Sequence, residues 1–363
     1  MKPLVFPGGS PRRILVRANN WIGDVVMISP SLKALRETYP HARIEIIAQP
    51  HVRDCFIGHP WVDEVIDYDP RGMHRGITGF RRLAAQLRGR GYDLAVLFQK
   101  AFGAALMAWM AKAPCRVGYD TDRRRLLLTH PVHETEHDRR IHHVDYFLRV
   151  ARAAGCEVNG EPRTVCFPLD DASRDFAERF LEKASARRFR FLAAMATGAS
   201  KPQRAWHAER FAAVARFLAR ERGAGVLIVG GPADRVDVAA ILDAAGDAGI
   251  DAVGQTSVKQ MAALIERCGV FIGNDSGPMH VAAALDVPVL AFFGPGTPAK
   301  TAPYMRPERF IALTNNFQCS PCRQDFFREC EPAPSLKPMC LETLSVGQAR
   351  IALDSLLTRA GLG

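Results

Sequence analysis

The feature that most constrains the fold is an alternation of short apolar runs with longer segments of helical periodicity. In the first half, we interpret four runs as strands: Arg13–Ala18, Ala42–Ala48, Asp63–Tyr68 and Tyr92–Phe98. Helical segments are predicted at Val25–Pro40, Gly79–Gly91 and Ile141–Ala154. Strands that alternate with helices of this length predict βαβ units and a parallel sheet.

The second half repeats the pattern after a polar, proline-bearing stretch, Cys156–Asp171, which we interpret as a linker. Its strands are predicted at Arg188–Ala196, Gly225–Gly231, Gly269–Asn274 and Val287–Gly294. Its helices are predicted at His207–Gly223, Ala233–Gly246, Ser257–Cys268 and Gly277–Leu285. A chain of 363 residues suits two domains. We therefore predict two doubly wound α/β domains, residues 1–165 and 166–363, each with a crevice at its strand ends.

Charge and hydropathy narrow the class of partner. The net charge of +10 favours an acidic partner such as a nucleotide or an anionic membrane surface. Nucleic acid is not expected, because the sequence lacks an aromatic-rich basic stripe and a zinc-finger signature. The most apolar stretch, Leu94–Pro114, is interrupted by Gln99 and Lys100, so we expect a strand and a buried helix rather than a membrane span. The first residues lack the apolar core of a signal peptide, which indicates a cytoplasmic protein.

Two polar segments follow predicted first strands. In "RANNWIGDVV", Asp24 either caps the next helix or faces a cleft between the domains as a general base. In "TGASKPQRAWHAERF", the side chains of Thr197, Ser200, Lys201 and Arg204 suit phosphate oxygens, although a polar surface loop explains them equally well.

Two further segments follow later strands. In "VGGPADR", Asp234 either accepts hydrogen bonds from a ribose or, as we slightly prefer, lies at a helix start. In "GNDSGPMHVAAAL", Asp275, Ser276 and Gly277 lie where a predicted helix begins, and the free N–H groups and dipole of that helix favour a diphosphate. Pro278 suits the first helical turn. An ordinary capped helix has the same residues, so the motif alone leaves the choice open.

Four of the nine cysteines are close in sequence, in the pattern Cys319-x2-Cys322-x7-Cys330-x9-Cys340. The clustering resembles a tetrathiolate site for zinc or iron, with reduced thiols or a redox pair as the alternatives. Five histidines also cluster, and we interpret them as a solvated loop and helix face: His130, His133, His137, His142 and His143.

Taken together, these blocks resemble glycosyltransferase family nine, the family of ADP-heptose:lipopolysaccharide heptosyltransferases. The resemblance covers roughly Arg13–Pro295, in the family's order, and is most specific in the D-S-G-x-x-H block and in the Gly23-Asp24 block. The cysteine-bearing tail resembles that of some members.

The resemblance implies a GT-B fold, with two Rossmann-like domains facing a cleft. The N-terminal domain would bind the acceptor and the C-terminal domain the nucleotide sugar. The implied reaction is inverting transfer of a heptose from ADP-heptose to a lipid-anchored oligosaccharide, the inner core of lipopolysaccharide, at the inner-membrane surface. The enzyme would be cytoplasmic and peripheral to that membrane.

The resemblance also implies roles for individual residues. Asp24 would be the base, and no metal would be required for catalysis. Arg204 stands where family members carry a Lys, so this residue departs from the family pattern. Asp275 would hold sugar hydroxyls, and the residues from Ser276 to Met279 would place backbone groups near the diphosphate. His280 matches the family histidine.

Three alternatives stay open on the sequence. The first is a GT-B transferase that uses another nucleotide sugar or a protein acceptor. The second is a nucleotide-sugar epimerase, which needs no acceptor. The third is a non-catalytic metal or nucleotide sensor, whose function would survive loss of Asp24.

Overall fold

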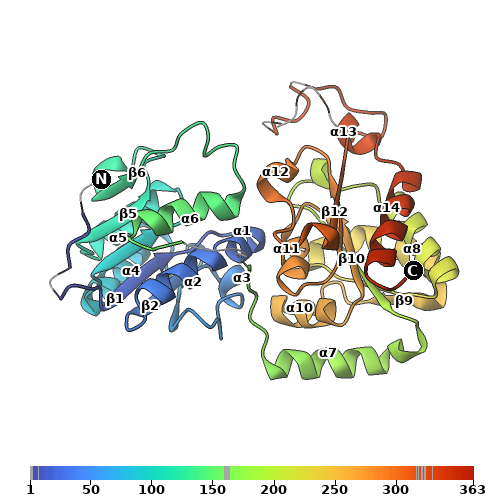
Figure 1. The fold of residues 1–363 in the computed structure, drawn as a ribbon, viewed down its shortest axis with the longest axis horizontal. Coiled ribbons are helices and arrows are strands. Elements are labelled where there is room, and N and C mark those ends of the chain that lie inside the picture. The colour runs from blue at the N-terminus through green and yellow to red at the C-terminus, as the bar shows by residue number, and fades with distance from the viewer. Residues whose placement is uncertain are drawn as a thin grey trace. The chain divides into compact units, whose positions relative to one another are not determined.

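The computed structural model describes residues 3–6, 8–158, 164–315, 317, 319, 322, 324–328 and 330–363. The chain divides into two compact units, Met1–Pro168 and Leu169–Gly363. Part of the predicted linker, residues 159–163, lies outside the described residues. Each unit is a parallel sheet with helices packed on it (Figure 1).

Unit 1 contains a six-stranded sheet in the order β3-β2-β1-β4-β5-β6, in which every neighbouring pair is parallel. Its strands are β1 (Arg13–Arg17), β2 (Arg43–Ala48), β3 (Glu64–Asp67), β4 (Leu94–Leu97), β5 (Cys115–Tyr119) and β6 (His130–Val132). Its helices are α1 (Ile22–Met27), α2 (Ser29–Thr38), α3 (Pro50–Arg53), α4 (Gly76–Arg90), α5 (Phe102–Met110) and α6 (His143–Ala153). Helices α1, α2 and α6 pack together on the sheet, while α4 packs with α5. The strand order reverses between β1 and β4, so a crevice is expected at the carboxyl end of β1.

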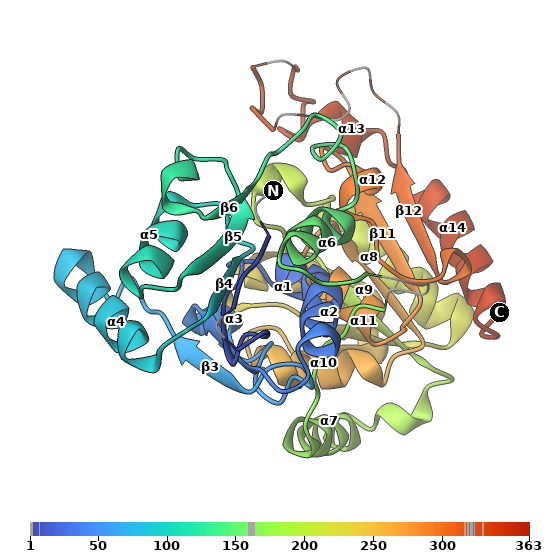
Figure 2. The same ribbon diagram turned by 60° about the vertical axis from the view of Figure 1, so that its left-hand side comes forward.

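Unit 2 repeats this architecture with the order β12-β11-β10-β7-β8-β9, again parallel throughout. Its strands are β7 (Leu192–Ala196), β8 (Gly225–Ile228), β9 (Gly249–Asp251), β10 (Val270–Asn274), β11 (Val289–Phe293) and β12 (Phe310–Thr314). Its helices are α7 (Asp171–Lys183), α8 (Ala208–Arg222), α9 (Val238–Ala245), α10 (Val258–Glu266), α11 (Gly277–Ala284), α12 (Pro298–Thr301), α13 (Met339–Glu342) and α14 (Val346–Arg359). Helices α8, α9 and α14 pack together, as do α7, α10 and α11 (Figure 2). The strand order reverses between β7 and β10.

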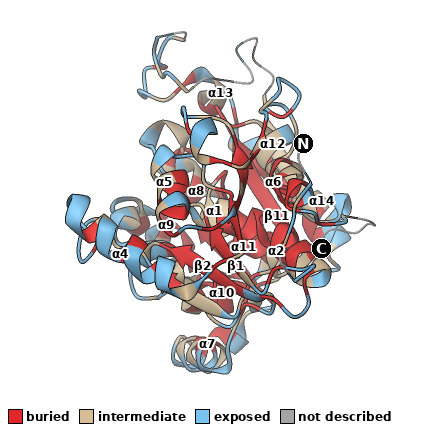
Figure 3. Cartoon of the chain, turned by 90° about the vertical axis from the view of Figure 1, so that its left-hand side faces the viewer, coloured by how far each residue is buried: buried red, intermediate tan, exposed pale blue. Residues whose placement is uncertain are grey.

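Burial follows the apolar runs. The central strands β1, β7, β10 and β11 are buried along nearly their whole length, whereas the outer faces of α4 and α7 are exposed (Figure 3). Strands covered on both faces read as continuous apolar runs, which explains why the sequence shows them clearly. The two sheets confirm the predicted pair of doubly wound α/β domains.

The helix predicted over Val25–Pro40 is wrong in one respect, because the structure breaks it at Ile28 into α1 and α2. Pro30 has no N–H with which to donate to the carbonyl of Val26. The Ser29 hydroxyl donates to that carbonyl instead, at 2.6 Å. The break ends α1 at Met27, three residues after Asp24.

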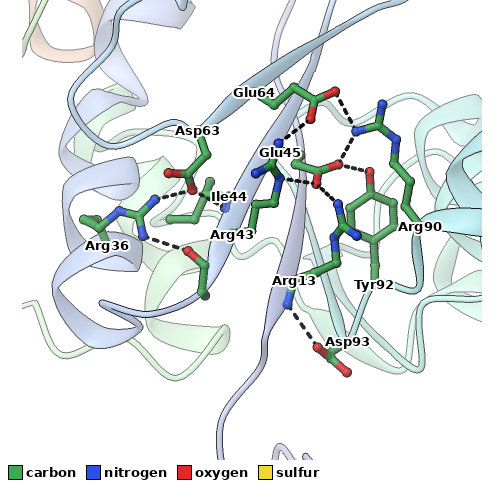
Figure 4. A network of polar contacts seen from close by, with 11 residues as sticks. Arg13, Arg36, Arg43, Ile44, Glu45, Asp63, Glu64, Arg90, Tyr92 and Asp93 are labelled. Carbon is green, nitrogen blue, oxygen red and sulfur yellow. Dashed lines mark hydrogen bonds and ion pairs between the residues drawn. The ribbon is translucent and has the colours of Figure 1, made fainter.

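A buried carboxylate, that of Glu45, lies at the end of the unit 1 sheet where the strands begin. The Glu45 side chain is fully buried and accepts hydrogen bonds from Arg13, Arg43, Arg90 and Tyr92 (Figure 4). Burial by itself raises the pKa of Glu45, but the bonds from Tyr92, Arg13 and Arg90 outweigh it and lower this pKa to about 2. Because parallel strands begin at one edge and end at the other, this network is remote from the crevice expected at the end of β1.

Candidate active site

The candidate site in unit 2 is built at the carboxyl ends of β7 and β10, which are neighbours in the sheet. Thr197 directly follows β7, and Asp275 directly follows β10. Parallel strands end at the same edge, so the two loops that the sequence predicted as phosphate-binding segments are brought together.

Asn274 joins the two loops, and the sequence reasoning gave it no role. Its side chain is fully buried. Its Oδ1 accepts from the backbone N–H of Trp206 at 2.9 Å, and its Nδ2 donates to the carbonyl of Thr197 at 2.7 Å. An asparagine immediately before Asp275 was the available signal, since a buried amide must satisfy both donor and acceptor.

Arg204 and Asp275 form the central ion pair of this site. Nη2 of Arg204 lies 2.6 Å from Oδ2 of Asp275 and also donates to the Asp275 carbonyl at 3.2 Å. Nη1 donates to the Ser200 hydroxyl at 3.4 Å. Gly296 leaves room for the carboxylate, because a Cβ there would lie 2.3 Å from Oδ2 of Asp275. The guanidinium thus reaches the loop that begins α11.

The N-terminus of α11 provides the anion-binding features that the sequence predicted. Ser276 is the N-cap residue, with no side-chain capping bond, and Pro278 lies in the first turn. The Ser276 hydroxyl is buried, and among the described residues no hydrogen-bond partner satisfies it. Met279 and His280 are buried, at 0% and 4% exposure, so their side chains pack inside unit 2. A ligand here would meet the N-cap hydroxyl and the free backbone N–H groups rather than those two side chains.

Lys201 is exposed, and its Nζ lies 5.2 Å from the centre of the Phe326 ring.

Asp234 caps the turn that follows β8. Its carboxylate accepts from the backbone N–H of Gly231 at 2.8 Å, and burial raises its pKa. Gly198 gives this carboxylate room, because a Cβ there would approach Asp234 Oδ1 to 2.1 Å. Asp234 therefore has a structural role, and any ribose contact remains a prediction.

In unit 1, Asp24 lies in the first turn of α1, at the strand end where the sheet order reverses. Its side chain is 22% exposed. It accepts from Nδ2 of Asn19 at 3.0 Å, and its Oδ1 lies 3.7 Å from Nδ1 of His143. The first residue of α6 thus contacts the predicted base, and a partly exposed carboxylate held by these neighbours is suited to accept a proton.

Two of the five clustered histidines depart from the predicted solvated face: His130 is only 7% exposed, and the ring of the 36% exposed His143 contacts Asp24. Nδ1 of His143 is buried, and within the described part of the chain it forms no hydrogen bond. The neighbouring His142 accepts from the backbone N–H of Val144 and caps α6. His133 lies 3.1 Å from the Asp120 carboxylate. Sequence spacing could not reveal the contact with Asp24, because 119 residues separate the two positions.

The four cysteines of the tail line one cavity of about 40 Å³: Cys319, Cys322, Cys330 and Cys340. Burial, followed by the nearby sulfurs of Cys319, Cys322 and Cys330, raises the pKa of Cys340 to about 11. Nonetheless, across the described ranges no group of three or more His, Cys, Asp or Glu side chains is arranged to hold a metal ion. The structure gathers the predicted thiols but does not place them in ligating geometry.

Two doubly wound, Rossmann-like units, each with its strand order reversed at one point, are the architecture of the GT-B fold. The model of glycosyltransferase family 9 (heptosyltransferase) matches residues 80–330, more than half of the chain, so the protein belongs to that family. This result confirms the resemblance noted in the sequence.

Individual relatives support the same family assignment. The chain is 29% identical over 315 residues to lipopolysaccharide heptosyltransferase 2 of Salmonella typhimurium, covering 84% of this chain and 89% of the relative. A glycosyltransferase family 9 structure from Veillonella parvula superposes with a TM-score of 0.82 at 26% identity, covering 96% of this chain and 97% of that one. The structure of E. coli ADP-heptose lps heptosyltransferase II shares the fold, with a TM-score of 0.78 at 23% identity over 96% and 99% of the two chains.

The apolar stretch Leu94–Pro114 forms β4 and α5, as predicted in outline. In the part of the chain that the structure describes, no helix is both long and apolar enough to span a bilayer.

Proposed function

We propose that this protein transfers a heptose, with inversion, from ADP-heptose to the inner core of lipopolysaccharide. The observation that carries the proposal is the arrangement at α11 of unit 2: the Arg204–Asp275 pair beside a buried N-cap hydroxyl that has no hydrogen-bond partner in the described structure. Family membership and the relatives named above support the choice of donor sugar and acceptor.

In this proposal, unit 2 binds the donor. The diphosphate lies at the N-terminus of α11, where the Ser276 hydroxyl and backbone N–H groups meet its oxygens. Arg204 and Lys201 supply positive charge, with further polar contacts from Thr197 and Ser200. Asp275 accepts hydrogen bonds from the sugar hydroxyls.

Unit 1 binds the acceptor, and Asp24 removes the proton from its attacking hydroxyl. The hydroxyl oxygen forms a bond to the anomeric carbon while the bond from that carbon to the diphosphate oxygen breaks. Attack on the face opposite the leaving group inverts the anomeric centre. The proton goes to Asp24 and the negative charge to ADP, where the cations of unit 2 stabilise it without a catalytic metal.

The proposal is tested by calorimetric titration of the purified protein with ADP, UDP, GDP and CDP, followed by ADP-heptose. We expect selective binding of ADP that the heptose strengthens. A preference for UDP or GDP would contradict the donor while keeping the transferase, and binding of none would favour the sensor.

We also propose that the protein works at the inner-membrane surface, on the cytoplasmic side. Support comes from an open concavity of about 480 Å³ on unit 1. Its lining includes Arg88, Lys112, Arg116 and the half-exposed Trp109, and its described lining has no carboxylate. Basic residues attract anionic headgroups, and Trp favours the interface.

Vesicle flotation tests this membrane role. The double variant Arg88→Gln, Lys112→Gln should float less with anionic vesicles than wild type. The same exchange at two exposed arginines of α8, Arg216 and Arg220, should not reduce flotation. Equal flotation of both variants, or wild-type binding that high salt leaves unchanged, would contradict it.

Finally, we propose that the four tail cysteines bind a structural zinc or iron ion. Four thiols around one small cavity supply the donor type and number of a tetrahedral site. Such sites seldom pre-exist without their ion, because binding and local folding are coupled. The ion would hold the tail together and take no part in the transfer.

A further inference from the structure

The cysteine-bearing tail also contacts the segment that carries the proposed donor cations. We use "donor loop" for Thr197–Arg210 and "cysteine segment" for the described residues from Phe317 to Leu344. The cysteine segment follows β12 and leads into α14. These two parts of the sequence are more than a hundred residues apart, yet they meet at several points in unit 2.

The first group of contacts fixes the far end of the donor loop. Glu342 lies 2.9 Å from Nη2 of Arg210 and 3.0 Å from Nε2 of His207. The carbonyl of Leu344 accepts from Nε1 of Trp206 at 3.0 Å. Trp206 is almost fully buried, so this end of the loop is fastened to the core.

The second group reaches the phosphate-binding part of the loop. Nζ of Lys337 donates to the carbonyl of Pro202 at 2.9 Å, within the turn Pro202–Arg204. Nζ of Lys201 lies 5.2 Å from the centre of the Phe326 ring, within cation–π range. Both cations proposed for the diphosphate, Lys201 and Arg204, are therefore next to a direct contact with the cysteine segment.

Phe326 connects these contacts to the thiols. Its ring lines the cavity shared by the four cysteines, together with Pro338 and Met339, the two residues after Lys337. Gly294, which directly follows β11, lines the same cavity. Two residues later, Gly296 packs closely against the carboxylate of Asp275. The cavity of the thiols therefore shares Phe326 with the contact to Lys201, and it is adjacent in sequence to Lys337, which contacts Pro202.

We propose that the cysteine segment is a positioning element for the donor site, and that its Phe326 ring and Lys337 ammonium set the placement of Lys201 and the Arg204 turn. The inference rests on the proposed donor function. Phe326 and Lys337 are positioning residues in this account.

Phe326→Ala, Phe326→Tyr and Phe327→Ala form a matched set, since Phe327 is the exposed neighbouring ring. ADP affinity is measured by calorimetry, and the donor KM and the kcat by transfer assay. We expect Phe326→Ala to weaken ADP binding and raise the donor KM roughly two- to fivefold, with kcat little changed. Phe326→Tyr keeps the ring and should restore both values, and Phe327→Ala should match wild type.

Equal donor KM and ADP affinity in the two alanine variants would overturn the inference. Failure of wild type to bind ADP would instead overturn the proposed donor function.

Discussion

The guanidinium of Arg204 lies 2.6 Å from the carboxylate of Asp275, although the two residues follow different strands and are 71 positions apart. The pair places a fixed positive charge beside the start of α11. It also neutralises that charge until an anion arrives, so a bound diphosphate would compete with Asp275 or share the fork of donors with it.

Replacing Arg204 tests this reading of the pair. Arg204→Ala should weaken ADP binding roughly ten- to a hundredfold, because a charge-assisted hydrogen bond to phosphate is lost. Arg204→Lys should fall between, since it keeps the charge and loses the fork. Calorimetry gives the affinities, with Arg216→Ala as the exposed control. An unchanged affinity in Arg204→Ala would exclude the residue from the donor site.

Asp24 should be needed for chemistry but not for donor binding. Asp24→Asn keeps the size of the side chain and removes the proton acceptor, so kcat should fall by about 10²–10⁴ while ADP affinity stays the same. Asp171→Asn is a suitable control, because Asp171 also lies in the first turn of a helix. Retention of wild-type kcat by Asp24→Asn would show that another group accepts the proton.

The contact between His143 and Asp24 gives a related prediction. His143→Phe removes the ring nitrogen 3.7 Å from the carboxylate and keeps a planar side chain. We expect a lower kcat and an altered pH profile of kcat, with the donor KM unchanged. A change in the donor KM alone would mean that His143 acts elsewhere.

The Glu45 network predicts a pH-dependent contribution to stability. Because the folded-state pKa is lowered to about 2, the stabilisation is present above the unfolded-state value and is lost as pH falls toward 2. Glu45→Gln should reduce the free energy of unfolding by about 3 kcal/mol at pH 7, and this difference should shrink as the pH falls below about 4.5. Urea unfolding at several pH values measures it. The exposed Glu37→Gln should have little effect, and a Glu45→Gln deficit that persists at pH 2 would contradict the assignment.

The tail predicts a metal content that depends on particular cysteines. Cys340→Ser should lose the zinc or iron found in freshly purified protein and lower the melting temperature, since one of four ligands is removed. Cys166→Ser, at a partly buried cysteine outside the tail, should keep the metal. Elemental analysis measures both. A wild-type protein without zinc or iron would refute the metal site.

The sequence predicted the central strands because they are apolar on both faces and separated by helices. It missed β5, in which Arg116 interrupts the apolar run, the three-residue strands β6 and β9, which are too short for a periodic signal, and the half-buried edge strand β12. It also missed the helices α7 and α14. The break between α1 and α2 had a visible cause in Pro30, but the compensating bond of Ser29 was not evident.

The site was predictable where its residues follow strands directly. Ser276 and Asp275 could be placed from the motif that precedes α11, and Asp24 from the end of β1. The role of Asn274 and the approach of His143 to Asp24 depend on pairs far apart in sequence, which local patterns do not encode. The same holds for Phe326 and Lys201, whose contact appears only when the tail is folded against the donor loop.

The most direct test of the central claim is a transfer assay with purified protein, ADP-heptose and a lipopolysaccharide acceptor that lacks the heptose. The account predicts one heptose added per ADP released, with inverted anomeric configuration, and transfer slowed about 10²–10⁴-fold by Asp24→Asn. Release of free sugar or an epimer without acceptor, or transfer only from a different nucleotide sugar, would contradict it.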